Sequence, residues 1–133
     1  MPITYEQVFS KSVEKVITAQ KKPTEARCWL FDEAGTINLE GSTQWVNTKI
    51  TIRVAVYEKL NGLTSISKPL NIYHRVDTGA WTKIATVTPT VPPGSYDYKY
   101  TLDSAGTHSF YSEFAGDATH AGCSAIASLS ARR

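Results

Sequence analysis

Residues 49 to 57 read KITIRVAVY, and this stretch decides the fold. Branched apolar residues occupy its even positions, while its odd positions hold polar, small and aromatic residues. Successive side chains of a β-strand point to opposite faces of a sheet, so this alternation predicts a strand with one buried and one solvated face. The buried set is Ile50, Ile52, Val54 and Val56, and the opposite set contains Thr51, Arg53 and Ala55.

Further candidate strands lie on both sides of this stretch, separated by turn residues about every 8–12 positions. They are Glu25–Phe31, Thr36–Glu40, Leu70–Val76, Ala80–Val87, Tyr96–Leu102, Thr107–Phe114 and Ser124–Leu129. Half-buried alternating strands are typical of antiparallel sheets with one wet face. The sequence therefore predicts an all-β sandwich or barrel over residues 24–133.

Residues 1–23 form a separate N-terminal arm in this interpretation. Its apolar side chains follow a near-helical spacing, Thr4 and Gln7 fit a helix-capping box, and Pro23 would end the helix. Several of these residues also occupy alternate positions, so an extended segment that pairs with another chain fits as well. In either form, the arm is expected to contact a neighbouring subunit through Tyr5, Phe9, Val13, Val16 and Ile17.

Length and composition limit the classes of function. A chain of 133 residues supports one domain, and its 41% hydrophobic content argues against intrinsic disorder. The formal net charge is only +2, which disfavours nucleic acid as a partner. No apolar run approaches the roughly 20 residues of a membrane-spanning helix, so no membrane insertion is expected.

No pattern typical of a catalytic or metal site is visible. His74, His108 and His120 lie in separate segments without ligand spacing, and His74 alternates with apolar residues that predict a core position. Nucleophile elbows and phosphate-binding loops are absent from the sequence. We therefore expect no catalytic residue, no metal and no cofactor, and hence no enzyme.

Three stretches resemble prokaryotic immunoglobulin-like repeat domains. Residues 103–110, DSAGTHSF, are similar to the D-x-A-G-x-Y-x-C corner that enters strand F, with His108 at the tyrosine position and Phe110 at the cysteine position. Residues 81–86 and 94–101 resemble strands C′ and E, and residues 114–123 resemble the family's F-x-G-D-x-x-Y-x-x-S ending. The resemblance covers about residues 48–129 and implies an immunoglobulin-like antiparallel β-sandwich of 7 or 8 strands.

The resemblance also implies where particular side chains lie. It places the first and last strands near each other, so that Cys28 and Cys123 could form a disulfide in place of the family's usual bridge. Tyr96, Tyr98 and Tyr100 share one face of a strand, which we interpret as core. The resemblance further implies an outward patch able to bind a protein or a glycan, made of Tyr73, Arg75, Trp81, Lys83, Tyr111 and Glu113.

These features predict a non-catalytic structural or adhesive module. We expect a homo-oligomeric subunit of an extracellular assembly, such as a cell-surface layer, a filament or a virion, located outside the cell although no signal peptide is visible. The alternative is a carbohydrate-binding module that uses the outward aromatic patch. Protein subunits are the expected partners in the first case, and a glycan is the expected partner in the second.

Overall fold

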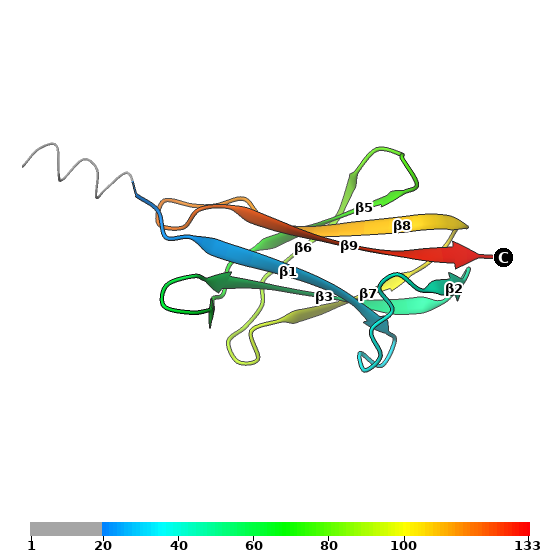
Figure 1. Cartoon of the computed structure of the whole chain (residues 1–133), viewed down its shortest axis with the longest axis horizontal. Coiled ribbons are helices and arrows are strands. Elements are labelled where there is room, and N and C mark those ends of the chain that lie inside the picture. The colour runs from blue at the N-terminus through cyan, green and yellow to red at the C-terminus, as the bar shows by residue number, and fades with distance from the viewer. Residues whose placement is uncertain (1–19) are drawn as a thin grey trace, which may run out of the picture.

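The structure, a computed structural model, describes residues 20–133 and folds them into β-strands joined by loops (Figure 1). The strands are β1 (Thr24–Asp32), β2 (Thr43–Trp45), β3 (Lys49–Glu58), β4 (Thr64–Ser65), β5 (Leu70–Val76), β6 (Thr82–Val87), β7 (Tyr96–Thr101), β8 (Gly106–Phe114) and β9 (Cys123–Arg132). The prediction of an all-β fold is confirmed.

The strands form two sheets. In the small sheet, β3 pairs along one edge with β1 and along the other with β7 and β4, and all of these pairings are antiparallel. In the large sheet, the strand order is β2-β9-β8-β5-β6. The short strand β2 runs parallel to β9, so the expectation of purely antiparallel sheets is wrong at this edge.

The core lies between the two sheets and follows the alternation in the sequence. Even positions of β3 face inward, and Ile50, Ile52, Val54 and Val56 are fully buried. From the large sheet, the inward residues include Leu70, Ile72, Phe110 and Leu129. Tyr98 and Tyr100 pack against this core as predicted, whereas Tyr96 at the start of β7 is 41% exposed.

One edge of the molecule is closed by the chain that leads into β1. Lys22 N–H donates to Thr119 O, and Ala121 N–H donates to Lys22 O, so this segment pairs with the loop between β8 and β9. The Thr24 hydroxyl adds a bond to Ala121 O at 2.6 Å. Figure 1 shows β1 running beside β9 from this end of the molecule, so the small and large sheets are joined along one side.

Three local expectations differ from the structure. The segment Thr36–Glu40 is not a strand, because the Asp32 carboxylate accepts bonds from the backbone N–H groups of Thr36 and Ile37 and holds a loop there. Only an isolated bridge between Phe31 and Asn38 remains. Conversely, β2 and β4 have only three and two residues, which is too short for a periodic pattern to reveal.

The predicted interaction arm lies almost entirely outside the described residues. Its residues Tyr5, Phe9, Val13, Val16 and Ile17 all belong to residues 1–19, so their role stays a prediction, as does the division into an arm and a domain. Within residues 20–133, no helix is long and apolar enough to span a membrane.

Candidate functional site

The outer surface of the large sheet carries aromatic and charged side chains that the core does not use. Ile72 and His74 of β5 point inward, which leaves Tyr73 and Arg75 on the outer surface. In β8, the inward residues include Phe110 and Ser112, so Tyr111 faces outward between them. The same alternation in β9 turns Ile126 outward, where it is 61% exposed.

The register of the strands places these side chains in rows across the large sheet. Tyr73 pairs with Tyr111, and Tyr111 pairs with Ile126. The next row on one side of this row contains Asn71, Glu113 and Ser124, which pair in that order across the sheet. The next row on the other side contains Arg75, which pairs with Ser109. Lys83 of the edge strand β6 pairs with Tyr73. We call this surface the outer aromatic face, made of Tyr73, Arg75, Trp81, Lys83, Tyr111, Glu113 and Ile126.

The rings on the outer aromatic face contact one another. Tyr73 and Tyr111 stack with centroids 4.5 Å apart and planes 18° apart, and Trp81 meets Tyr111 edge-on at 4.7 Å. The guanidinium of Arg75 lies over the Trp81 ring, 4.5 Å from its centroid. Contacts of this kind restrict side-chain rotation, so the face is already ordered before any partner arrives.

A shallow hollow of about 430 Å³ lies beside the stacked tyrosines. Its lining residues are Tyr111, Glu113, Ser124, Ala125 and Ile126. Glu113 has no cation within 4 Å among the described residues and is bonded only to the Asn71 amide at 3.3 Å. Burial, followed by the charge of Glu113, raises the pKa of Tyr111 above its usual value, so this phenol stays protonated at neutral pH.

The six residues predicted to form an outward patch all lie on this face. The structure brings Tyr73, Trp81 and Tyr111 into contact and adds Arg75 to the cluster. That the group binds a ligand stays a prediction. The sequence analysis did not include Ile126 in the patch. Ala125, Ala127 and Leu129 occupy odd positions and face inward, so the even-numbered Ile126 between them is expected to face outward.

His74 and His108 form a hydrogen-bonded pair inside the sandwich, so His74 has the inward position that its alternation predicted. His74 Nε2 lies 2.8 Å from His108 Nδ1, and His108 Nε2 lies 2.8 Å from Ser104 O. The Tyr100 hydroxyl lies 3.3 Å from His74 Nδ1. Burial lowers the pKa of His74 from 6.5 to about 4, with a further contribution from His108 and an opposing one from Asp103.

His120 lies in a separate charged cluster, near the start of β1. Its Nε2 is 3.1 Å from Glu58 Oε1, which Lys22 Nζ also approaches at 3.3 Å. On the same loop, Asp117 binds Lys68 Nζ at 2.7 Å. This bond, together with backbone N–H donors of Thr119 and His120, holds the pKa of Asp117 far below its usual range. These contacts fasten the loop between β8 and β9.

Cys28 and Cys123 are free thiols in the structure, which does not contain the disulfide that the resemblance implied. Cys28 points into the core near Ser112, whereas Cys123 pairs with Phe114 farther along β8 and its thiol contacts Thr24. Burial raises the pKa of Cys28 to about 12. With so high a pKa, the Cys28 thiol is protonated at neutral pH and is a poor nucleophile.

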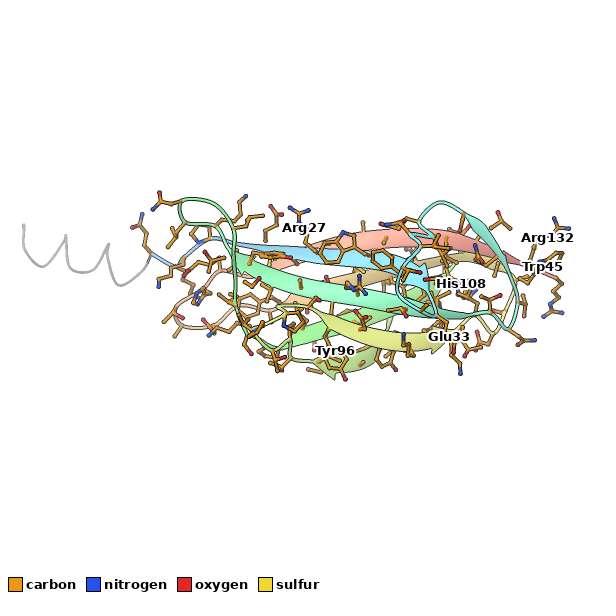
Figure 2. All side chains as sticks on the ribbon, turned by 90° about the horizontal axis from the view of Figure 1, so that it is seen from below. Arg27, Glu33, Trp45, Tyr96, His108 and Arg132 are labelled. Atoms are coloured by element: carbon orange, nitrogen blue, oxygen red, sulfur yellow. The ribbon has the colours of Figure 1, made fainter. Side chains whose placement is uncertain are left out.

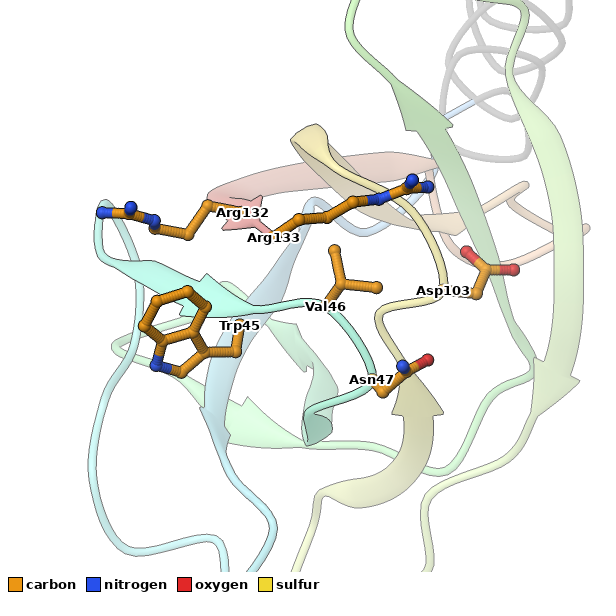
Figure 3. A pocket seen from close by; sticks show the side chains of 6 residues that line it. All are labelled: Trp45, Val46, Asn47, Asp103, Arg132 and Arg133. Carbon is orange, nitrogen blue, oxygen red and sulfur yellow. The ribbon is translucent and has the colours of Figure 1, made fainter.

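A second hollow, of about 450 Å³, lies at the end of the molecule where the described chain finishes. Figure 2 shows Trp45 and Arg132 together at this end, with the Arg132 guanidinium 4.9 Å from the centre of the Trp45 ring. Figure 3 shows Arg133 extending from the same strand toward the side of Asp103. The hollow thus contains charges of both signs and selects neither anions nor cations.

No protein-family model matches the chain, and no curated protein matches it. Two similar solved structures are variants of the superoxide reductase (neelaredoxin) from Ignicoccus hospitalis. The first variant is 10% identical, with a TM-score of 0.51 over 98% of this chain and 100% of that chain. The second variant is 11% identical, with a TM-score of 0.48 over 90% of this chain and 87% of that one. At this identity the likeness of the first variant shows a shared fold alone, and the score of the second supports no argument.

This shared fold corrects several expectations. The resemblance to immunoglobulin-like repeat domains is wrong as an assignment, because the similar solved structures are superoxide reductases. The expectation of a structural or adhesive subunit of an extracellular assembly is also wrong, as is the exclusion of an enzyme, because the fold is that of proteins named as enzymes. Extracellular location and partner identity stay predictions.

The superoxide reductase fold is one with an iron site, but the residues described here do not fit iron. Within residues 20–133, no three His, Cys, Asp or Glu side chains gather closely enough to hold a metal ion. The facing nitrogens of His74 and His108 are bonded to each other. The comparison therefore supports a fold shared with superoxide reductases and carries no iron chemistry to residues 20–133.

Proposed function

We propose that this chain is a protein-binding domain whose partner docks on the outer aromatic face. The observation that supports the proposal is the contact cluster of Tyr73, Tyr111 and Trp81 with Arg75, beside a hollow of about 430 Å³. Tyrosine, tryptophan and arginine are the residues that most often dominate the binding energy of protein interfaces.

The arrangement of the rings favours a protein over a glycan. A sugar stacks on the flat face of an exposed ring, but Tyr73 and Tyr111 cover one face of each other, and Arg75 covers one face of Trp81. What the cluster presents includes ring edges and the exposed aliphatic side chain of Ile126. Such a mixture of apolar surface and polar tips suits the side chains of another protein.

The outer surface of the small sheet is a weaker candidate because Arg53, Asp97 and Lys99 there already have hydrogen-bond partners. Arg53 binds Asp97 through two nitrogens at 2.7 and 3.0 Å, and Lys99 Nζ donates to Glu33 O at 2.6 Å. On the outer aromatic face, by contrast, Glu113 has no cation near it among the described residues. A charged group without a partner is available for recognition at lower cost.

A selection of random peptides displayed on phage tests this proposal. We expect the wild-type protein to enrich peptides whose binding is lost in Tyr111→Ser and retained in Tyr57→Ser, a matched change on the outer surface of the small sheet. Thermal unfolding of each variant controls for loss of structure. Enriched peptides that bind Tyr111→Ser as well as the wild type, or no enrichment at all, would contradict the proposal.

A further inference from the structure

The charges on the outer aromatic face are divided between its two ends. Glu113 lies one row from the central row of Tyr73, Tyr111 and Ile126, and Arg75 lies one row from it on the other side. The row spacing is the same in both directions because alternate residues of a strand share a face. The face is therefore acidic at one end and basic at the other, with aromatic rings in the middle and the exposed Lys83 at the β6 edge of the central row.

This arrangement is complementary to itself. A two-fold axis that runs along the central row, perpendicular to the strands, turns one copy of the sheet onto another and reverses the strand direction. The operation places Glu113 of one copy opposite Ser109 of the other, and Ser109 pairs in its own sheet with Arg75. Neighbouring strands lie about 4.8 Å apart, which the long side chains of Glu113 and Arg75 can bridge.

We propose that the partner is a second copy of this chain, bound face to face through the outer aromatic face with Glu113 of each copy paired to Arg75 of the other. This inference rests on the proposed function, because it names the partner for the same surface. The two-fold creates both ion pairs at once, as in any isologous interface. It also packs the central row of each copy against the same row of the other. The exposed Lys83 side chains then meet at the β6 edge of the interface, where both ammonium groups must turn outward into solvent.

Arg75 is suited to this pairing by the way it is held. Its guanidinium lies with its face over Trp81, which leaves the N–H groups in its plane free to bind a carboxylate. Its Nε is buried and has no hydrogen-bond partner among the described residues. The terminal nitrogens can then bind Glu113 of the second copy while the stack on Trp81 remains intact.

The size of the face predicts a weak dimer. Four strands about 4.8 Å apart, each contributing about seven residues with a rise of about 3.3 Å, span a flat area of roughly 450 Å² per copy. This area does not include the additional surface of the protruding side chains. A standard stable interface buries about 800 Å² on each partner. We therefore expect dissociation at micromolar or higher concentration and measurable exchange between monomer and dimer.

Charge reversal provides the test, because the same chain carries both halves of each contact. Sedimentation equilibrium of the full chain at rising concentration should show a monomer–dimer equilibrium for the wild type. Glu113→Arg and Arg75→Glu should each raise the dissociation constant by about tenfold or more. The double variant, which restores opposite charges across the two-fold, should regain dimerisation. Glu33→Arg, which reverses an exposed charge on the small-sheet side, should leave it unchanged.

The outcomes separate this inference from the proposed function. A wild type that stays monomeric to millimolar concentration overturns the second-copy inference, while peptide binding lost in Tyr111→Ser would still support the proposed function. A dimer that resists both reversals, or a double variant that stays monomeric, overturns the face-to-face pairing. A monomer that also enriches no peptide removes both proposals.

Discussion

His74 and His108 illustrate how single atoms fix a local state. Ser104 O can only accept a hydrogen bond, so His108 Nε2 carries the proton and donates it. In the neutral pair, His108 Nδ1 therefore accepts from His74 Nε2–H, and His74 Nδ1 is left to accept from the Tyr100 hydroxyl. The chain of bonds thus has one direction, and a proton added to His74 removes the acceptor that Tyr100 uses.

The shift at His74 predicts a pH dependence of stability. Its pKa is about 4 in the folded chain and 6.5 in the unfolded chain, so between these values the unfolded state binds more protons. Stability is then complete above pH 6.5 and falls as the pH approaches 4. After discounting for partial exposure, we expect a loss of about 1–2 kcal/mol from this residue.

Urea unfolding between pH 7 and pH 5 measures this effect, in a range above most carboxyl titrations. His74→Gln keeps a donor toward His108 but does not titrate, so its stability should fall less steeply over the same range. If the free energy of unfolding falls equally steeply with pH in the wild type and in His74→Gln, His74 is not the source of the pH dependence.

The cysteines are expected to differ in reactivity. Cys28 is 6% exposed and its pKa is raised to about 12, so the folded protein should resist alkylation there at pH 8. Cys123 is half-buried and should react more readily. Iodoacetamide labelling followed by mass spectrometry should give one slow and one faster site, and both should react in denaturant without reductant. Two sites that stay unlabelled in denaturant would show a disulfide instead.

At the scale of the elements, β7 depends on one neighbour. Among residues 20–133 it pairs only with β3, and the pairing carries an ion pair in which Arg53 binds Asp97 through two nitrogens. Arg53 also donates to Gly35 O at 3.2 Å, so the same side chain fastens the loop after β1. The hydrogen bond from Arg53 lowers the pKa of Asp97, and the carboxylate stays charged at neutral pH.

A double-mutant cycle of Arg53→Met and Asp97→Asn should give a coupling of about 1 kcal/mol at pH 7 and low salt. This value lies at the upper end for partly exposed pairs, because the geometry is bidentate. High salt should reduce it. A coupling indistinguishable from zero in low salt would mean that the register of β3 and β7 depends on backbone bonds and packing alone.

The elements that could be predicted from the sequence are the half-buried ones. In segments such as Lys49–Glu58 and Gly106–Phe114, the even positions face the core, and that direction is what an alternating pattern encodes. The pattern does not predict that Thr51, Ala55 and Ser109, on the opposite side of these strands, are buried as well. The strand β2 is fixed by pairing with a distant segment, Thr43–Trp45 against the end of β9, whereas β4 pairs with the nearby end of β3 and has only two residues. Pairing between distant segments leaves no local pattern to find.

The candidate site could be predicted in part for the same reason. The parity of Tyr73, Arg75 and Tyr111 within their strands indicates a common outward direction. The stacking of the rings and the hollow beside Glu113 depend on the register between β5, β8 and β9, which no local pattern specifies. The disulfide was inferred from a family resemblance, and the structure places Cys28 and Cys123 in different contacts.

At the scale of the whole molecule, the chain shares its fold with superoxide reductase but, within residues 20–133, lacks a cluster of donor groups that could hold a metal. A fold can host unrelated functions, since function resides in the groups that a particular chain adds to it. In this chain, the outer aromatic face supplies a set of such groups. We propose that a second copy of the chain binds at this face.

A distance between two copies tests this claim most directly. Ile126→Cys in a Cys123→Ser background places a spin label on the central row, which lies on the proposed two-fold axis. Because face-packed sheets are about 10 Å apart, pulsed electron resonance at high protein concentration should give one short label-to-label distance of about 20 Å or less. The absence of a signal between copies, or a broad distribution of much longer distances, would contradict the claim.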